Sequence, residues 1–198
     1  KTFAIRMLVL YCFSIVLPFA FSIYNTKIKF NKERKLVIMQ VTDIHYGESE
    51  EKDTNSTKLL NQLMKEVKPD MVALTGDALT GYEWDGKNQT FYYDHWRHWS
   101  GVFNDTKIPY AYTNGNHDTQ ADLNINEIME LDRTHEMAIA REQFHPDYPI
   151  DHLEMLQSHK FNFSQGNYFI RVYSSLEDEN EKSPVSMILW FFDSGRDG

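Results

Sequence analysis

Cysteine is almost absent from this chain of 198 residues, in which Cys12 is the only one. A single cysteine cannot form a disulfide within the chain, so the fold must be held by its hydrophobic core or by bound metal. Basic residues are also scarce, because 20 Lys and Arg stand against 29 Asp and Glu and give a net charge of −9. This charge argues against a protein that holds a nucleic-acid backbone by electrostatic attraction.

Internal repeats and low-complexity tracts are missing as well. Hydrophobic residues make up 41% of the chain and charged residues 25%, which excludes collagen-like, solenoid and disordered proteins. The length permits one domain with a sizeable core. We place this domain at residues 35–198, after two short segments, 1–22 and 23–34.

Residues 1–22 have the layout of a secretory signal. Lys1 and Arg6 precede the apolar run 7–17, and the small residues Ala20 and Ser22 follow it. The alternative is a retained membrane anchor, for which the apolar stretch is barely long enough. We expect cleavage near Ser22, a short leader at 23–34, no stable membrane span, and a protein that is secreted or lies in the endomembrane, lysosomal or vacuolar lumen. Because the first residue is Lys1 and not Met, we also expect the sequence to be one piece of a longer product.

Four Asn-x-Ser/Thr triplets support export. None has Pro at its middle position, so each is a possible acceptor of an N-linked glycan in a surface loop. The acceptor residues are Asn55, Asn88, Asn104 and Asn162.

Apolar runs of strand length alternate with helical patterns from residue 36 onward. The predicted strands are 36–41, 71–74 and 109–113, and the helices between them are 56–67 and 91–103. Strand–helix–strand units of this length predict parallel strands joined by right-handed crossovers. The strand 36–41 is apolar on both faces, so we expect it to be covered on both sides.

The pattern changes in the second half of the chain. A polar helix is predicted around 126–143, and the strands 167–173 and 185–192 are joined as a hairpin, which makes the sheet mixed. In the helix 56–67, the spacing of the apolar residues predicts one buried face. Its members are Leu59, Leu60, Leu63, Met64 and Val67.

Polar turns follow three successive strands, and each turn carries side chains that bind metals. Because the carboxyl ends of parallel strands face one crevice, we expect the three turns to converge. Carboxylate, imidazole and amide donors suit Mn, Fe or Zn, and the lack of thiols argues against a structural zinc site. Gly76 and Gly115 would permit tight bends or a close approach of the backbone. The candidate residues are Asp43 and His45, then Asp77, then Asn116, His117 and Asp118.

The blocks Asp43-x-His45, Gly76-Asp77 and Gly115-Asn-His-Asp118 resemble the first three signature blocks of the calcineurin-like metallophosphoesterases. The surrounding sequence is similar to a secreted eukaryotic branch related to purple acid phosphatases. The resemblance implies the N-terminal part of an α/β fold, an αββα sandwich with mixed sheets. It also implies a phosphoester hydrolase that acts on a phosphorylated substrate with two metal ions (Mn, Fe or Zn) and a metal-bound hydroxide.

The same resemblance implies a role for each residue. Asp43 and His45 would bind the first metal, Asp77 would bridge both metals, and Asn116 would bind the second. His117 would assist at the leaving group, and Asp118 would either orient the His117 ring or cap the following turn. Thr80 stands where purple acid phosphatases carry a tyrosine ligand, so a purple ferric site is not implied.

The other histidines fit different roles. His95 and His98 flank Trp96, and a partly buried aromatic face explains them better than metal ligation. We expect the family's later histidine ligands to lie beyond Gly198, since the sequence has no Gly-His-x-His block. If the second metal is incompletely held, the alternative function is non-catalytic binding of a phosphorylated ligand or a partner. The histidines expected on the surface are His135, His145, His152 and His159.

Overall fold

The computed structural model describes residues 27–140, 166–175 and 184–193. The expected signal peptide, Asn162, and the histidines at 145, 152 and 159 lie outside these residues. The described elements are β1 (Ile28–Lys29), β2 (Ile38–Val41), α1 (Glu50–Val67), β3 (Met71–Thr75), η1 (Gly81–Glu83), α2 (Phe91–Thr106), β4 (Tyr110–Thr113), η2 (Asp118–Gln120), α3 (Ile125–Asp132), β5 (Tyr168–Tyr173) and β6 (Val185–Phe191).

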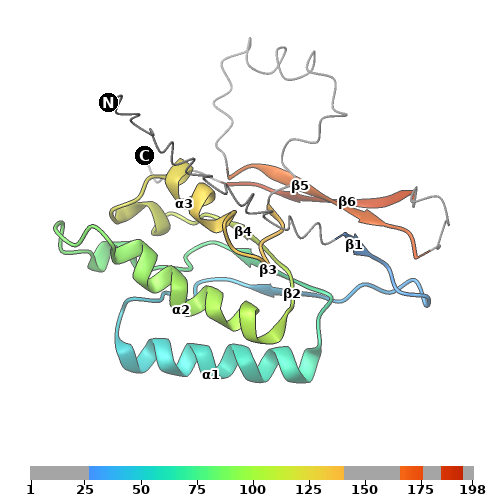
Figure 1. The fold of residues 1–198 in the computed structure, drawn as a ribbon, viewed down its shortest axis with the longest axis horizontal. Coiled ribbons are helices and arrows are strands. Elements are labelled where there is room, and N and C mark those ends of the chain that lie inside the picture. The colour runs from blue at the N-terminus through green and yellow to red at the C-terminus, as the bar shows by residue number, and fades with distance from the viewer. Residues whose placement is uncertain (1–26, 141–165, 176–183, 194–198) are drawn as a thin grey trace, which may run out of the picture.

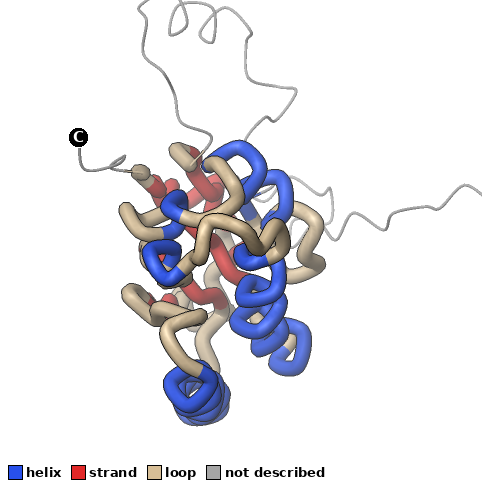
Figure 2. The backbone as a smooth tube through the Cα atoms, turned by 90° about the vertical axis from the view of Figure 1, so that its left-hand side faces the viewer, coloured by secondary structure: helices blue, strands red, loops and turns tan. Residues whose placement is uncertain are grey.

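Two three-stranded sheets form the centre of the molecule. In the first, β2, β3 and β4 are all parallel, as the strand–helix–strand pattern predicts. In the second, β1 is parallel to β5, while β5 and β6 are antiparallel, so this sheet is mixed. The helices α1 and α2 border the parallel sheet on one side, and β5 and β6 lie on its other side (Figure 1). Figure 2 shows the same layers turned by 90°. The prediction of a mixed α/β fold with the layers of a metallophosphoesterase is confirmed.

The strand β1 lies inside the segment that we treated as a short leader. Ile28 is buried and pairs with Val172 of β5. The folded part of the chain therefore begins earlier than residue 35.

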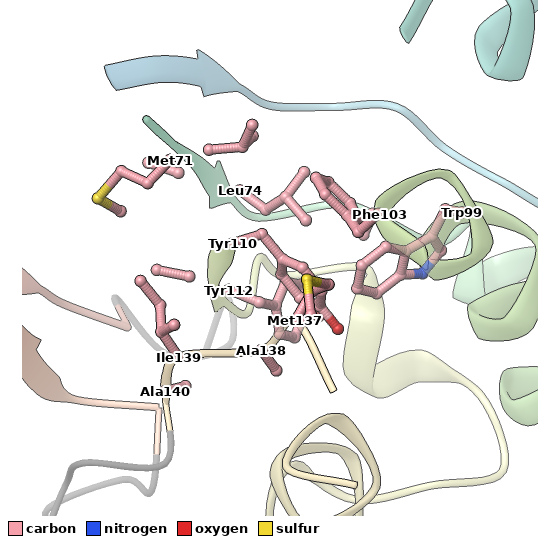
Figure 3. Close-up of a cluster of buried hydrophobic side chains, with 14 of the residues drawn as sticks. Met71, Leu74, Trp99, Phe103, Tyr110, Tyr112, Met137, Ala138, Ile139 and Ala140 are labelled. Carbon is pink, nitrogen blue, oxygen red and sulfur yellow. The ribbon is translucent and has the colours of Figure 1, made fainter. Parts of the chain in front are cut away.

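Aromatic packing joins the parallel sheet to α2. The Phe103 ring lies 4.3 Å from the Tyr110 ring, and Trp99 meets Tyr110 edge to face at 5.5 Å between centroids. Figure 3 shows these side chains together with Leu74 of β3 in one buried cluster. Because β3 lies between two strands and is buried at four of its five positions, its loop has a rigid base.

The helix α1 begins earlier than predicted, at Glu50, because the Ser49 side chain accepts a hydrogen bond from the Lys52 amide and caps it. Leu60 and Met64 are buried, whereas Leu59 is 56% exposed, which corrects the predicted apolar face. Consecutive residues point about 100° apart around a helix, so Leu59 turns away from the stripe that Leu60 occupies. Val67, the last helical residue, is also exposed.

Two predictions about exposure are wrong. Ile38 and Gln40 of β2 are exposed, so this strand is not covered on both sides. Both residues face a cleft next to β6, which explains why that face stays open. His135 is buried and not on the surface, because its ring packs against Trp96 and Tyr110.

The helix α3 is shorter than predicted and ends at Asp132. Beyond it, Met137 accepts a backbone hydrogen bond from Tyr110, and Ile139 donates one to Tyr110, which places this segment beside β4. Of the possible glycan acceptors, Asn88 lies in a loop, but Asn55 and Asn104 are exposed positions on α1 and α2. The expectation of surface loops is therefore wrong for these two. In the part of the chain that the structure describes, no helix is long and apolar enough to cross a membrane.

Candidate metal centre

The loops after β2, β3 and β4 bring metal-binding side chains together at one edge of the parallel sheet. One ligand atom each from Asp43, His45 and Asp77 lies within 4.8 Å of the others. Asp43, Asp77 and Asn116 line a cleft of about 460 Å³ between the parallel sheet and β6. The three turns that the sequence selects therefore do converge, and their carboxylate, imidazole and amide donors fit a metal site.

The backbone at these residues is held in an uncommon conformation. Asp43, His45 and Asp77 all have positive φ, at 55°, 48° and 48°. Such left-handed residues cost free energy and persist only where the surroundings fix them. Backbone hydrogen bonds supply that support, since the Asp43 amide donates to the Gly76 carbonyl at 3.1 Å and the His45 amide to the Asp77 carbonyl at 3.0 Å.

Glycine is needed at two positions where these loops meet. Gly76 has a φ of +99°, and a Cβ placed on it would lie 2.8 Å from the Gly115 Cα. A Cβ on Gly115 would in turn collide with the Asp77 side chain and backbone. The two glycines therefore allow the loops after β3 and β4 to touch, as the sequence predicts.

Asp77 joins two of the loops. The residue is 8% exposed, and its Oδ1 accepts a hydrogen bond from the His117 amide at 2.8 Å. This bond fixes the orientation of the carboxylate on the loop after β3 relative to the loop after β4.

Asp118 also joins loops, and it does so through the backbone. Its Oδ1 accepts from the Leu79 amide at 2.9 Å, and its Oδ2 accepts from the Gly115 amide at 2.8 Å. Burial raises the pKa of this carboxyl to about 7, although these hydrogen bonds act in the opposite direction. These contacts tie Asp118 to the amides of Leu79 and Gly115, and neither of them is a contact with the His117 ring.

The ring of His117 is oriented by Gln120, a residue that the sequence patterns did not select. The His117 Nδ1 lies 3.0 Å from the Gln120 Oε1, three residues later in η2. On its other side, the half-exposed Tyr82 meets the His117 ring edge to face at 4.9 Å between centroids. The His45 ring lies 5.6 Å from that of His117, so both histidines face the same small region.

Thr80 supports His45. Its hydroxyl donates to the His45 carbonyl at 2.9 Å and lies 3.4 Å from the His45 Nδ1. From the sequence, Thr80 is notable only because purple acid phosphatases carry a tyrosine ligand at this position. Its contacts show that the threonine holds the loop that carries His45. In the same way, the Thr42 hydroxyl donates to the Asp43 Oδ2 at 2.5 Å.

A second group of possible ligands consists of Asp53 on α1 with His95 and His98 on α2. The His95 ring does pack on Phe91 at 4.6 Å, as an aromatic face would require. Its Nδ1, however, also lies 3.7 Å from the Asp53 Oδ2. Burial lowers the pKa of the His95 imidazole, although Asp53 opposes this. Periodicity missed this group because its members come from different helices.

Comparison with known proteins agrees with the geometry. The family model described as calcineurin-like phosphoesterase matches residues 36–196. A probable inactive purple acid phosphatase of Arabidopsis thaliana is 27% identical over 189 residues, which cover 86% of this chain and 44% of that protein. An uncharacterised protein of Schizosaccharomyces pombe is 27% identical over 118 residues, 51% of this chain and 22% of that protein. The chain therefore spans less than half the length of these relatives.

Among solved structures, a dimetal phosphatase from Danio rerio is similar with a TM-score of 0.38 and 15% sequence identity. The similarity covers 50% of this chain and 35% of the zebrafish protein.

Proposed function

Because the chain belongs to the calcineurin-like phosphoesterase family, we propose that it acts as a metal-dependent phosphoester hydrolase with two metal ions. One observation carries the proposal: ligand atoms of Asp43, His45 and Asp77 lie within 4.8 Å of one another at the ends of parallel strands. Asn116 lines the same cleft as Asp43 and Asp77. The substrate is a phosphorylated molecule, and the net charge of −9 argues against a nucleic-acid scaffold.

Each role in the proposal falls to a residue of this chain. Asp43, His45, Asp77 and Asn116 would hold ions of the Mn, Fe or Zn class, which supply charge neutralisation and water activation when bound. The hydrogen bond from the His117 amide keeps the Asp77 carboxylate turned toward the cleft loops. Asp118 keeps the loops after β3 and β4 at a fixed separation through its two backbone contacts.

His117 is the proposed proton donor to the leaving oxygen. With Gln120 Oε1 as the acceptor, the Nδ1 of His117 carries a proton, and Nε2 is the nitrogen that exchanges one with the substrate. The Tyr82 ring restricts the rotation of the imidazole from its other side. This arrangement suits a general acid.

The second candidate is binding of a phosphorylated ligand without turnover. The name of the Arabidopsis relative, which calls that protein probably inactive, favours it. In this case the same residues would bind the metal and the phosphorylated molecule. The chemical step would fail because too few side chains coordinate the second metal.

The substitution Asp77→Asn tests both candidates. Asn keeps an acceptor for the His117 amide but loses the charge that would bridge two cations. We therefore expect the full-length protein to lose the metal bound at this centre and its hydrolysis of aryl phosphates. The matched control is Asp105→Asn, at an exposed position of α2, which should change neither quantity. Normal metal content and turnover in Asp77→Asn would contradict the dinuclear centre. Metal binding by the wild type without hydrolysis of any phosphoester would favour the second candidate.

We also propose that the protein is exported and glycosylated. The order of basic, apolar and small residues at 1–22 supports export, and the exposed positions of Asn55, Asn88 and Asn104 are compatible with glycans. Expressed in a eukaryotic secretory host, the protein should begin near residue 23 and lose mass on treatment with an N-glycosidase. A cytosolic product with an intact N-terminus and no change in mass would contradict export.

A further inference from the structure

Outside the candidate metal centre, three further side chains with metal-binding atoms meet between α1 and α2. Asp53 lies in the first turns of α1, and His95 and His98 lie one helical turn apart on α2. One ligand atom from each lies within 4.8 Å of the others. In the described residues, this cluster and that of Asp43, His45 and Asp77 are the two groups of three or more such side chains.

The His95 and Asp53 donor atoms are too far apart for a hydrogen bond, but their separation is close to that of two ligands of one cation. The His95 Nδ1 lies 3.7 Å from the Asp53 Oδ2, beyond the range of a hydrogen bond. Two ligands of one tetrahedral zinc ion lie about 3.3–3.6 Å apart, given metal–ligand distances of 2.0–2.2 Å. The His95 Nδ1 is also buried and has no hydrogen-bond partner. A buried nitrogen without a partner is costly unless something occupies the space in front of it.

The chain around the cluster holds the ligands in place. Both Asp53 carboxylate oxygens accept from the Gly47 amide, at 3.0 and 3.1 Å. Gly47 has a φ of +97°, and a Cβ there would lie 3.1 Å from the His95 ring. The Phe91 ring also packs edge to face against the His95 ring. His95 is therefore confined between a glycine backbone and an aromatic ring.

The local charge also favours a cation. The segment 48–53 contains Glu48, Glu50, Glu51 and Asp53, against the single basic residue Lys52. Lys52 pairs with Glu48 and so does not neutralise Asp53. The negative potential at this end of α1 attracts a divalent ion toward the exposed His98.

We propose that Asp53, His95 and His98 bind a zinc-type divalent cation that joins the start of α1 to α2. One carboxylate and two imidazoles are donors that zinc accepts, and water on the exposed side of His98 completes the shell. The role is structural, because the ion fixes Gly47, which lies two residues after His45. The site is thus separate from the candidate metal centre but stabilises one of its loops.

Zinc titration in an Asp77→Asn background tests the proposal, because this substitution is expected to empty the other centre. By isothermal titration calorimetry, full-length Asp77→Asn should bind one equivalent of Zn²⁺. Adding His98→Ala should weaken that binding by more than about 10-fold, since even loss of a residue that only supports a ligand costs 10–100-fold. Adding Arg97→Ala instead, at an exposed neighbour on α2, should leave the affinity unchanged.

Two further measurements keep the test decisive. Asn at position 53 can still accept from the Gly47 amide, so Asp53→Asn should fold normally and lose zinc as His98→Ala does. Co²⁺ should give a tetrahedral visible spectrum that both variants abolish. Absence of zinc binding in Asp77→Asn, or equal affinity with and without His98→Ala, would overturn the proposal. A failure of the proposed function is distinguishable, because it would appear as equal metal content in the wild type and Asp77→Asn.

Discussion

The two sheets of this molecule differ in how completely they are covered. In the parallel sheet, every residue of β4 and all but one of β3 are buried, although the edge strand β2 has no buried residue. In the mixed sheet, β6 has one buried residue and exposes Val185, Ile188 and Trp190. The strained loops with Asp43, His45 and Asp77 all follow strands of the parallel sheet. Backbone strain is tolerated where the surroundings over-determine the conformation. Here the buried strand β3 fixes the loop with Asp77, and backbone hydrogen bonds to that loop hold Asp43 and His45. The mixed sheet contributes the apolar wall of the cleft, residues 189–192.

The largest effect is expected on catalysis, from His117→Ala. Removing the proposed acid should slow hydrolysis by roughly 10²–10⁴-fold, about 3–5 kcal/mol of activation free energy. Metal content should stay near that of the wild type, because His117 contributes its backbone amide and not its ring to Asp77. The measurement is kcat for a series of aryl phosphates, together with bound metal per chain.

Substrates with different leaving groups provide the control for His117→Ala. A proton donor matters less when the departing phenolate is stable, so the loss should shrink for substrates with acidic phenols. Gln120→Ala, which only frees the His117 ring, should cause a smaller loss in kcat. Equal losses across the series would show that His117 does not donate the proton.

In the parallel sheet, Leu74→Ala should destabilise the fold by about 2–5 kcal/mol. Leu74 of β3 is 2% exposed and belongs to the cluster with Phe103 and Tyr110 in Figure 3. Truncation leaves a cavity there, because the aromatic rings on α2 and β4 are too constrained to fill it. Urea unfolding followed by tryptophan fluorescence measures the change. A loss below 1 kcal/mol would mean that this sheet is no better packed than the mixed one.

Asp118→Asn should cost about 1–3 kcal/mol of stability, because one of two buried backbone amides loses its acceptor. Asn has a single acceptor oxygen, so either the Leu79 amide or the Gly115 amide would face an NH₂ group. The same urea experiment measures the loss. Asp122→Asn, which alters a partly buried carboxylate bonded to one amide, of Tyr92, is the matched control and should cost less.

The metal-binding loops could be predicted from the sequence because each one directly follows an apolar strand. The positions of Asp43, Asp77 and Asn116 at strand ends, and the parallel order of those strands, are enough to bring them to one cleft. The match of the family model to residues 36–196 confirms family membership, and the two observed sheets confirm the mixed α/β fold. Catalysis and export remain predictions.

Contacts between segments far apart in the sequence could not be predicted in this way. The burial of His135 depends on Trp96 of α2 and Tyr110 of β4, neither of which its own segment reveals. Asp118 looks like a partner of its neighbour His117, yet its oxygens reach the Leu79 and Gly115 amides. The exposed face of β2 is set by the position of β6, which its composition does not encode.

The smallest effect on stability is expected in the mixed sheet, from Trp190→Thr. Trp190 is 58% exposed, and its ring stacks on that of Phe192 at 6.1 Å between centroids and is tilted against that of Phe169 at 5.2 Å. Thr retains a strong preference for strands, so we expect a loss below about 1 kcal/mol, mostly from the aromatic pairs.

The same substitution should reduce self-association, because among the described strands β6 pairs only with β5, and exposed apolar strand edges promote association. Sedimentation velocity at increasing concentration of residues 23–198 measures this, and Phe191→Thr is the matched control. Phe191 is 7% exposed and stacks on Tyr168 at 4.9 Å, so its replacement should cost several kcal/mol, by analogy with the 3–5 kcal/mol typical of a buried Phe→Ala change. If Trp190→Thr destabilised the protein as much as Phe191→Thr, both faces of β6 would be covered in solution, and the contrast between the two sheets would disappear.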